Sequence, residues 1–146
     1  MEQQDIKTII SRIYTQAKQL NACDKFTGEE DLEALVRLFL SPQGIEFCIA
    51  HHFPNTATFR LFKPYRLEQY GIYIDAGDIT LKNPERAVLI GRTQATVRCD
   101  TNTRHKVIVL HGAKALVSAS RWAVVFTEVE AGSTCIKSTT DNAIVL

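Results

Sequence analysis

The chain has 146 residues, of which 45% are apolar and 23% are charged, and its formal net charge is +1. These fractions are typical of an ordinary globular protein, and they exclude a disordered chain and a protein that binds nucleic acid through a strong overall positive charge. No apolar segment reaches the roughly 18 residues that suggest a membrane-spanning helix, and the polar residues 1–5 do not resemble a secretory signal. We therefore expect a cytoplasmic protein with no membrane partner.

Residues 5–70 show the 3.6-residue period of short amphipathic helices. An apolar stripe from Ile6 to Leu20 predicts the first helix. Thr27 and Glu30 have the spacing of a capping box, in which each side chain bonds a backbone amide of the other residue's turn. This pair predicts the start of the second helix at Thr27.

Further residues in this half of the chain predict where helices begin or end. Ser41 can cap a third helix, and Pro42 after it suits the first helical position. Asn55 can cap a fourth short helix, and Gly71 suits the left-handed position after a last turn. Residues 1–70 are therefore predicted to form a helical module of four or five short helices.

After Gly71 the apolar period falls from 3.6 to 2, and short β-forming triplets recur roughly every nine residues between turn-forming spacers. Two strands in each coil would give about 19 residues per turn, which lies within the range of solenoid repeats. We therefore predict a parallel β-solenoid over residues 71–146. The triplets begin at Ile79, Val88, Ala95, Val107, Ala115, Val124, Thr134 and Ala143.

Small side chains beside these triplets favour the solenoid, because the walls of a narrow coil converge. An antiparallel β-sandwich is the alternative, since strands at intervals of 8–12 residues also fit that fold. The predicted fold class is α+β, with the helical module, residues 1–70, capping one end of the solenoid, residues 71–146. The recurring alanines are Ala87, Ala95, Ala115, Ala123 and Ala143.

The junction between the halves carries a resemblance to a known group of proteins. The segment FPNTATFRLF at residues 53–62, followed by GIYID at residues 71–75, is similar to a junction in small uncharacterised proteins of gut Bacteroidetes. Those proteins pair a helical N-terminal module with a C-terminal β-repeat, and some are linked to mobile elements. The repeat also resembles the β-helical repeats of bactofilin-type polymer-forming proteins. Both resemblances imply the layout of the chain, and neither implies an activity.

The sequence contains no recognisable catalytic, cofactor or metal site. Glycine-rich phosphate loops and nucleophile motifs are absent, and the four cysteines have neither CxxC nor zinc-ligand spacing with histidine. Adjacent His51 and His52 would point about 100° apart on a helix, so a polar helix end is the better interpretation. Asp75 and Asp78 are interpreted as turn residues. The cysteines are Cys23, Cys48, Cys99 and Cys135.

Two functions other than protein interaction stay open at this stage. Four acids of the repeat could align along one solenoid face and act on a carbohydrate or another polymer, if the coil register allowed it. The basic residues of the second half could bind nucleic acid, but they are scattered, so a solvated surface is the better interpretation. The acids are Asp100, Glu128, Glu130 and Asp141.

The preferred hypothesis is a non-enzymatic structural or protein-interaction protein. Trp122 follows Arg121 in a polar spacer, and exposed Trp and Arg are enriched where proteins bind one another. Ile144, Val145 and Leu146 are expected on a terminal rung, whose unpaired backbone groups can accept a further strand. We therefore expect self-association or a protein partner, and these five residues are the candidate interaction residues.

Overall fold

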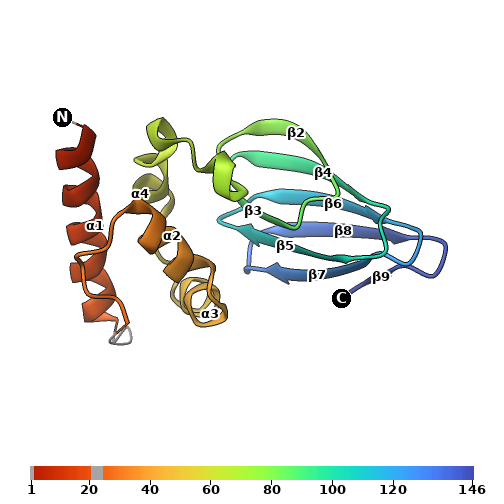
Figure 1. Ribbon diagram of the computed structural model, residues 1–146, viewed down its shortest axis with the longest axis horizontal. Coiled ribbons are helices and arrows are strands. Elements are labelled where there is room, and N and C mark those ends of the chain that lie inside the picture. Colours follow the sequence, from red (N-terminus) through yellow and green to blue (C-terminus); the bar gives the residue numbers. More distant parts are fainter. Residues whose placement is uncertain (1, 21–24) are drawn as a thin grey trace. The chain divides into compact units, whose positions relative to one another are not determined.

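The computed structural model describes residues 2–20 and 25–146 of the chain. The chain divides into two compact units, Met1–Phe62 and Lys63–Leu146. The first unit holds the four α-helices and the second holds all the strands (Figure 1). None of the described helices is long and apolar enough to cross a bilayer. The order of a helical module and then a β-solenoid is as predicted, whereas the capping of one by the other stays a prediction.

The first unit is built on the apolar faces of its helices. The stripe predicted on the first helix is buried, with Ile10 only 1% exposed and Ala17 only 2% exposed. On the second helix Val36 is buried, and the ring of Phe39 packs edge-on against Phe59. The helices are α1 (Glu2–Gln19), α2 (Leu32–Leu40), α3 (Pro42–His51) and α4 (Thr56–Arg60).

The second helix begins four residues later than predicted. The Glu30 carboxylate accepts hydrogen bonds from the backbone amides of Thr27 and Gly28, at 2.9 and 2.8 Å, as a capping box would. However, Gly28 has a φ of +87°, which ends any helical path there. Asp31 caps α2 instead, and its Oδ1 accepts from the Ala34 amide at 2.8 Å. The capping-box contacts therefore form a turn ahead of the helix.

The predicted N-caps of the third and fourth helices are confirmed. Ser41 Oγ accepts from the Gly44 amide at 3.1 Å at the start of α3, directly before Pro42. Asn55 Oδ1 accepts from the Thr58 amide at 2.8 Å at the start of α4. Each side chain satisfies one of the amides that a helix start leaves without a partner.

Two short 3-10 turns, η1 (Lys63–Tyr65) and η2 (Leu67–Tyr70), lead into the strands. Gly71 follows η2 with a φ of +79°, the left-handed position that the sequence predicted. A Cβ at Gly71 would lie 2.6 Å from the carbonyl oxygen of Arg86. Glycine is therefore required both by the backbone conformation and by the close approach of the next coil.

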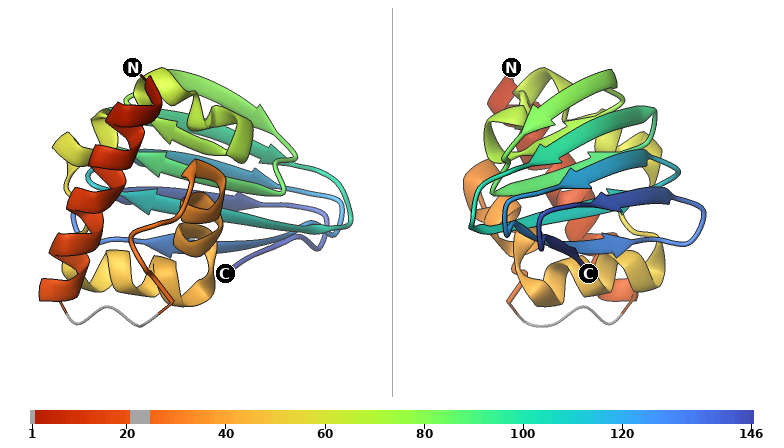
Figure 2. Two further views of the ribbon diagram at one scale, coloured as in Figure 1. Left: turned by 60° about the vertical axis from the view of Figure 1, so that its left-hand side comes forward. Right: turned by 90° about the vertical axis from the view of Figure 1, so that its right-hand side faces the viewer.

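The second unit is a β-solenoid of two parallel sheets. The strands alternate between the sheets, with order β1-β3-β5-β7-β9 in one and β2-β4-β6-β8 in the other. Figure 2 shows these strands stacked in chain order, from green to blue. All the described strand pairs are parallel, so the antiparallel sandwich is wrong. The strands are β1 (Ile72–Ile74), β2 (Gly77–Lys82), β3 (Arg86–Ile90), β4 (Thr93–Cys99), β5 (Arg104–Leu110), β6 (Lys114–Ala119), β7 (Val124–Val129), β8 (Thr134–Thr139) and β9 (Ile144–Val145).

The strand register defines the length of each coil. Ile72 pairs with Val88, so the first coil advances 16 residues. Val88 pairs with Ile108, and Val124 with Ile144, so the later coils advance 20 residues. This agrees with the period of about 19 expected for two strands per coil. Residues that occupy the same place in successive coils therefore stack directly on one another.

Alternate side chains of both sheets point inward and form one core. Leu89 stacks on Val109, and Val97 stacks on Val117, and all four are at most 2% exposed. The predicted small residues line this core as well, because four of the five recurring alanines are fully buried. The buried core residues are Ala87, Leu89, Ala95, Val97, Cys99, Val107, Val109, Ala113, Ala115, Val117, Ala119, Ala123 and Val125.

The last coil differs from the earlier ones at its inward positions. Lys137 continues the inward column of Val97 and Val117, and Thr139 continues that of Cys99 and Ala119. Both side chains are exposed, and β8 pairs with β6 alone. An inward-pointing charge on an edge strand is a known protection against edge-to-edge pairing. Strand β8 therefore carries polar side chains at two positions that are apolar in the earlier strands of this sheet.

Truncation of an inward side chain should destabilise the protein much more than truncation of an outward one. Leu89→Ala should lower the free energy of unfolding by about 2–5 kcal/mol, because Leu89 is fully buried in the core. Ile136→Ala is the matched control, since Ile136 is 51% exposed on β8. Denaturant unfolding of both variants measures the difference, and equal losses would contradict the assignment of the core.

Candidate interaction surface

Trp122 lies on a tight corner between β6 and β7. Arg121 and Trp122 both have left-handed backbone conformations, with φ of 54° and 66°. The Trp122 amide donates to the carbonyl oxygen of Asp141 in the next coil at 3.1 Å. The Trp122 residue is 61% exposed, so the corner presents its indole to solvent.

The equivalent corner of the next coil has the residue types that this backbone favours. Asp141 and Asn142 stand there with φ of 51° and 61°. Asn and Asp tolerate the left-handed region well, whereas other L-residues lose roughly 1–2 kcal/mol per residue in it. Arg121 and Trp122 therefore occupy a backbone conformation that their residue types do not favour. Local strain of this kind is common at functional sites.

An apolar patch continues from this corner along the outward face of β7 and β9. Alternation along the strands places Val124 and Phe126 on the outward side of β7. Val124 pairs with Ile144, and the Leu146 amide donates to the Val125 carbonyl, which places Leu146 beside Phe126. Strands in a sheet lie about 4.8 Å apart, so these side chains are in contact range. The apolar patch is defined as Val124, Phe126, Ile144 and Leu146.

The apolar patch is open to solvent. Phe126 is 39% exposed, Ile144 is 49% exposed and Leu146 is 57% exposed. By contrast, the outward apolar side chains of β1, β3 and β5 in the same sheet are all at most 5% exposed, whereas Arg86, Arg104 and Lys106 on these strands are not buried. The register separates these two sets, because Arg104 and Lys106 precede Val124 and Phe126 in their columns, and Glu128 follows Ile108. The buried outward residues are Ile72, Ile74, Val88, Ile90, Ile108 and Leu110.

Basic residues border the apolar patch along β5. Arg104 pairs in register with Val124, and Lys106 pairs with Phe126. Lys106 Nζ lies 3.3 Å from Glu128 Oε2, which has no hydrogen-bond partner, so this is a charge contact without hydrogen-bond alignment. Arg104 is exposed and forms no ion pair within the described part of the chain.

The structure brings most of the predicted interaction residues to one region. Ile144 and Leu146 belong to the apolar patch, and Arg121 and Trp122 precede β7 at its corner. Val145 points the other way and packs against the inner core. Sequence reasoning did not select Phe126 or Arg104. The 20-residue register would have found both, because it places them beside Leu146 and Val124.

Asn83 and Asp100 form a polar cluster in the earlier coils, on the same side of the solenoid as Trp122. Asn83 Nδ2 donates to Asp100 Oδ1 at 2.7 Å, and the Asp100 amide donates to Asn83 Oδ1 at 2.8 Å. The hydrogen bond from Asn83 is the main cause that lowers the pKa of Asp100, and Lys82 and Arg121 contribute with their charges. These contacts anchor the loop that makes the later coils four residues longer than the first.

The opposite corner is held by a buried histidine and a buried glutamate. Glu130 Oε1 accepts from the His111 amide at 2.7 Å and lies 2.9 Å from His111 Nδ1. Their side chains are 4% and 1% exposed. His111 has a φ of +56°, so the carboxylate fixes a left-handed corner. Sequence reasoning did not foresee this pair, because the two residues meet only through the coil register.

The four acids that could have formed a catalytic row do not lie together. Asp100 and Asp141 lie on connections that follow β4 and β8, whereas Glu130 lies on the opposite corner, after β7. Glu128 is on the outward face of β7, beside Lys106. The described solenoid therefore offers no row of carboxylates for acid–base chemistry.

The basic residues of the solenoid do not form a stripe. On the outward face of β2, β4, β6 and β8, Lys82 pairs with Arg98, but Ser118 and Ser138 continue that column. Lys114 stands in another column, between Gln94 and Thr134. A track of phosphate contacts would need adjacent cations along a face. This sheet does not present one, and in the other sheet Arg86 pairs with Lys106 but Phe126 continues that column.

The other residues considered for chemistry have structural roles. His51 ends α3 and His52 follows it as the C-cap, so the pair forms a helix end as expected. Asp75 Oδ1 accepts from the Arg92 amide at 2.7 Å, the turn role that was predicted. Of the cysteines, Cys48 and Cys99 are buried and Cys135 is partly buried, and Cys23 lies outside the described residues.

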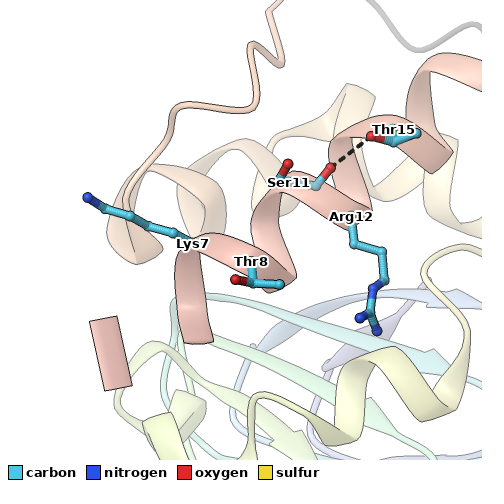
Figure 3. A pocket seen from close by; sticks show the side chains of 5 residues that line it. All are labelled: Lys7, Thr8, Ser11, Arg12 and Thr15. Atoms are coloured by element: carbon cyan, nitrogen blue, oxygen red, sulfur yellow. Dashed lines mark hydrogen bonds between the residues drawn. The ribbon is translucent and has the colours of Figure 1, made fainter. Parts of the chain in front are cut away.

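The first unit carries a polar pocket on α1. All its lining side chains are exposed and come from this one helix (Figure 3). The Thr15 hydroxyl donates to the Ser11 carbonyl at 3.1 Å. Hydroxyls and two cations without an acid or a thiol do not form a catalytic set. The lining residues are Lys7, Thr8, Ser11, Arg12 and Thr15.

Comparison with known proteins adds no relative to this description. The chain matches no family model, and neither the curated proteins nor the solved structures compared with it gave a match.

The strained corner predicts a stabilising substitution. Arg121→Asn combined with Trp122→Gly should raise the free energy of unfolding by about 1 kcal/mol, because Asn-Gly is the preferred sequence for two left-handed residues. The matched control is Asp141→Asn with Asn142→Gly, which should change stability less, since these residue types already suit the corner. Thermal or denaturant unfolding measures both. A double variant at 121 and 122 that is no more stable than the wild type would show that the corner is not strained.

Proposed function

We propose that the protein is a non-enzymatic protein-interaction module of the cytoplasm. Its docking surface is the apolar patch of Val124, Phe126, Ile144 and Leu146 together with Trp122. The observation that carries this proposal is the exposure of Phe126, Ile144 and Leu146 on one outward face, with Trp122, which is 61% exposed, at the corner before β7. Contiguous exposed apolar surface with a polar rim is typical of sites where proteins bind one another.

The composition of the surface also supports protein binding. Aromatic residues and arginine supply most of the binding energy of protein interfaces, and this surface contains Trp122 and Phe126 with Arg104 and Arg121 beside them. The left-handed corner supports the same proposal, because Arg121 and Trp122 are retained there against the preference of the backbone. Free cysteines in the solenoid fit the reducing conditions of the cytoplasm.

Action on a carbohydrate and binding of nucleic acid are less well supported. The acids lie on different corners and faces, and the basic residues form no stripe on the described strands. The resemblance to proteins of gut Bacteroidetes suggests an association with mobile elements, and this stays part of the proposal.

Edge-to-edge pairing with a second copy is disfavoured at strand β8, so we propose a different chain as the partner. End-to-end pairing of two β8 strands would bring two Lys137 ammonium groups into one interface. Like charges at such close range oppose association, and burial of an unpaired ammonium adds to the loss. The apolar patch is on the outward face of the other sheet, so it is available to a partner without that conflict.

Site-specific photocrosslinking tests the proposal. A benzoylphenylalanine residue at position 144, in the natural host's cells, should give a discrete crosslinked species after irradiation. The same residue at position 118 is the matched control, because Ser118 is exposed on the outward face of β6. Crosslinking should fall sharply when Phe126→Ser is added to the position-144 protein. Equal crosslinking from both positions, or none from position 144, would contradict the proposed docking surface.

A further inference from the structure

We infer that the partner is a protein segment that carries carboxylates beside its apolar side chains, and that Arg104 and Arg121 recognise those carboxylates. This inference rests on the proposed docking surface and specifies its partner. It is carried by the position of two cations at the same end of the apolar patch, neither of which has an ion pair among the described residues.

Arg104 is the nearer of the two cations. It occupies the outward position of β5 directly beside Val124, about 4.8 Å away across the sheet. The residue is exposed, and the next acid on this face, Glu128, lies four positions along β7 from Val124 and contacts Lys106 instead. A guanidinium in this position is available for bidentate binding of a carboxylate.

Arg121 lies at the corner where the apolar patch begins. Its charge lowers the pKa of Asp100, but the two side chains form no ion pair. Asp100 itself is already engaged with Asn83 through two hydrogen bonds. Asp141 stands at the equivalent corner of the next coil, so Arg121 lies between two acids, whereas Arg104 has no ion pair among the described residues.

The positive charges of Arg104 and Arg121 also favour one kind of partner for the apolar patch over another. A second copy bound through the same patch would bring two sets of Arg104 and Arg121 into one interface, because a two-fold contact repeats every residue. An acidic segment would instead meet these cations with opposite charge, which favours association and excludes wrong partners. The inference therefore selects a different, acidic protein segment, and leaves a lipid surface as an outcome that the test must separate.

Charge reversal in the crosslinking experiment tests the inference. With benzoylphenylalanine at position 144, Arg104→Glu combined with Arg121→Glu should lower the yield of the crosslinked species about tenfold in the host lysate. Arg98→Glu combined with Lys114→Glu is the matched control, because it makes the same charge change on the outward face of the other sheet. The control should leave the yield unchanged. Mass spectrometry should find Asp or Glu close to apolar residues in the crosslinked segment of the partner.

The outcomes separate this inference from the proposed function. Strong crosslinking that neither arginine substitution affects, or a crosslinked segment without acids, would overturn the acidic partner and leave the docking surface standing. No crosslinking from position 144 would overturn both. Co-sedimentation of the wild-type protein with phosphatidylglycerol vesicles, lost on the arginine substitutions, would also overturn the inference, because the anions recognised would then be lipid headgroups. We expect no co-sedimentation.

Discussion

Residues that stand 20 apart along the chain stack on one another in the later coils, and the arrangement of the solenoid depends on this spacing. It places Val97 on Val117 and Leu89 on Val109, so that each inward column is apolar through the middle of the unit. The hydrophobic contribution is roughly proportional to the apolar area removed from water, and these residues are almost fully buried. The same spacing decides which residues remain outside. An outward surface can therefore change its residues from coil to coil without affecting the core.

The final strands of the two sheets differ from the earlier strands in two ways. In one sheet β8 has Lys137 and Thr139 in place of apolar inward residues. In the other sheet Phe126, Ile144 and Leu146 are outward and exposed. The exposure of these apolar side chains supports the proposal that the patch binds a partner.

The architecture could be predicted from the sequence, because turn residues and β-forming triplets recur at nearly regular intervals. Each triplet lies in or beside a strand, and the left-handed Gly71 stands where the junction pattern placed it. The start of α2 could not be placed correctly, because Thr27 and Glu30 form capping contacts in a turn that Gly28 prevents from becoming helical. Local patterns describe such contacts without deciding whether a helix follows.

The candidate surface was only partly predictable, since several strands are apolar on both faces. In β5, Val107 and Ile108 are both buried although they point in opposite directions, so alternation does not show which face is inward. The register between coils resolves this, and it separates Val145, which is inward, from Ile144 and Leu146. The pairing of His111 with Glu130 was hidden for the same reason, because their contact exists only between coils.

The most direct test of the account compares outward and inward side chains of the same coils in denaturant unfolding. Phe126→Ser combined with Ile144→Ser should lower the free energy of unfolding by less than about 2 kcal/mol, because Phe126 is 39% exposed and Ile144 is 49% exposed and neither belongs to the inner core. Val107→Ser combined with Val125→Ser should lower it by more than about 4 kcal/mol, because both are fully buried and serine would add a polar group to the core. Similar losses for the two pairs would show that the outward patch serves the fold, and would contradict its assignment to a partner.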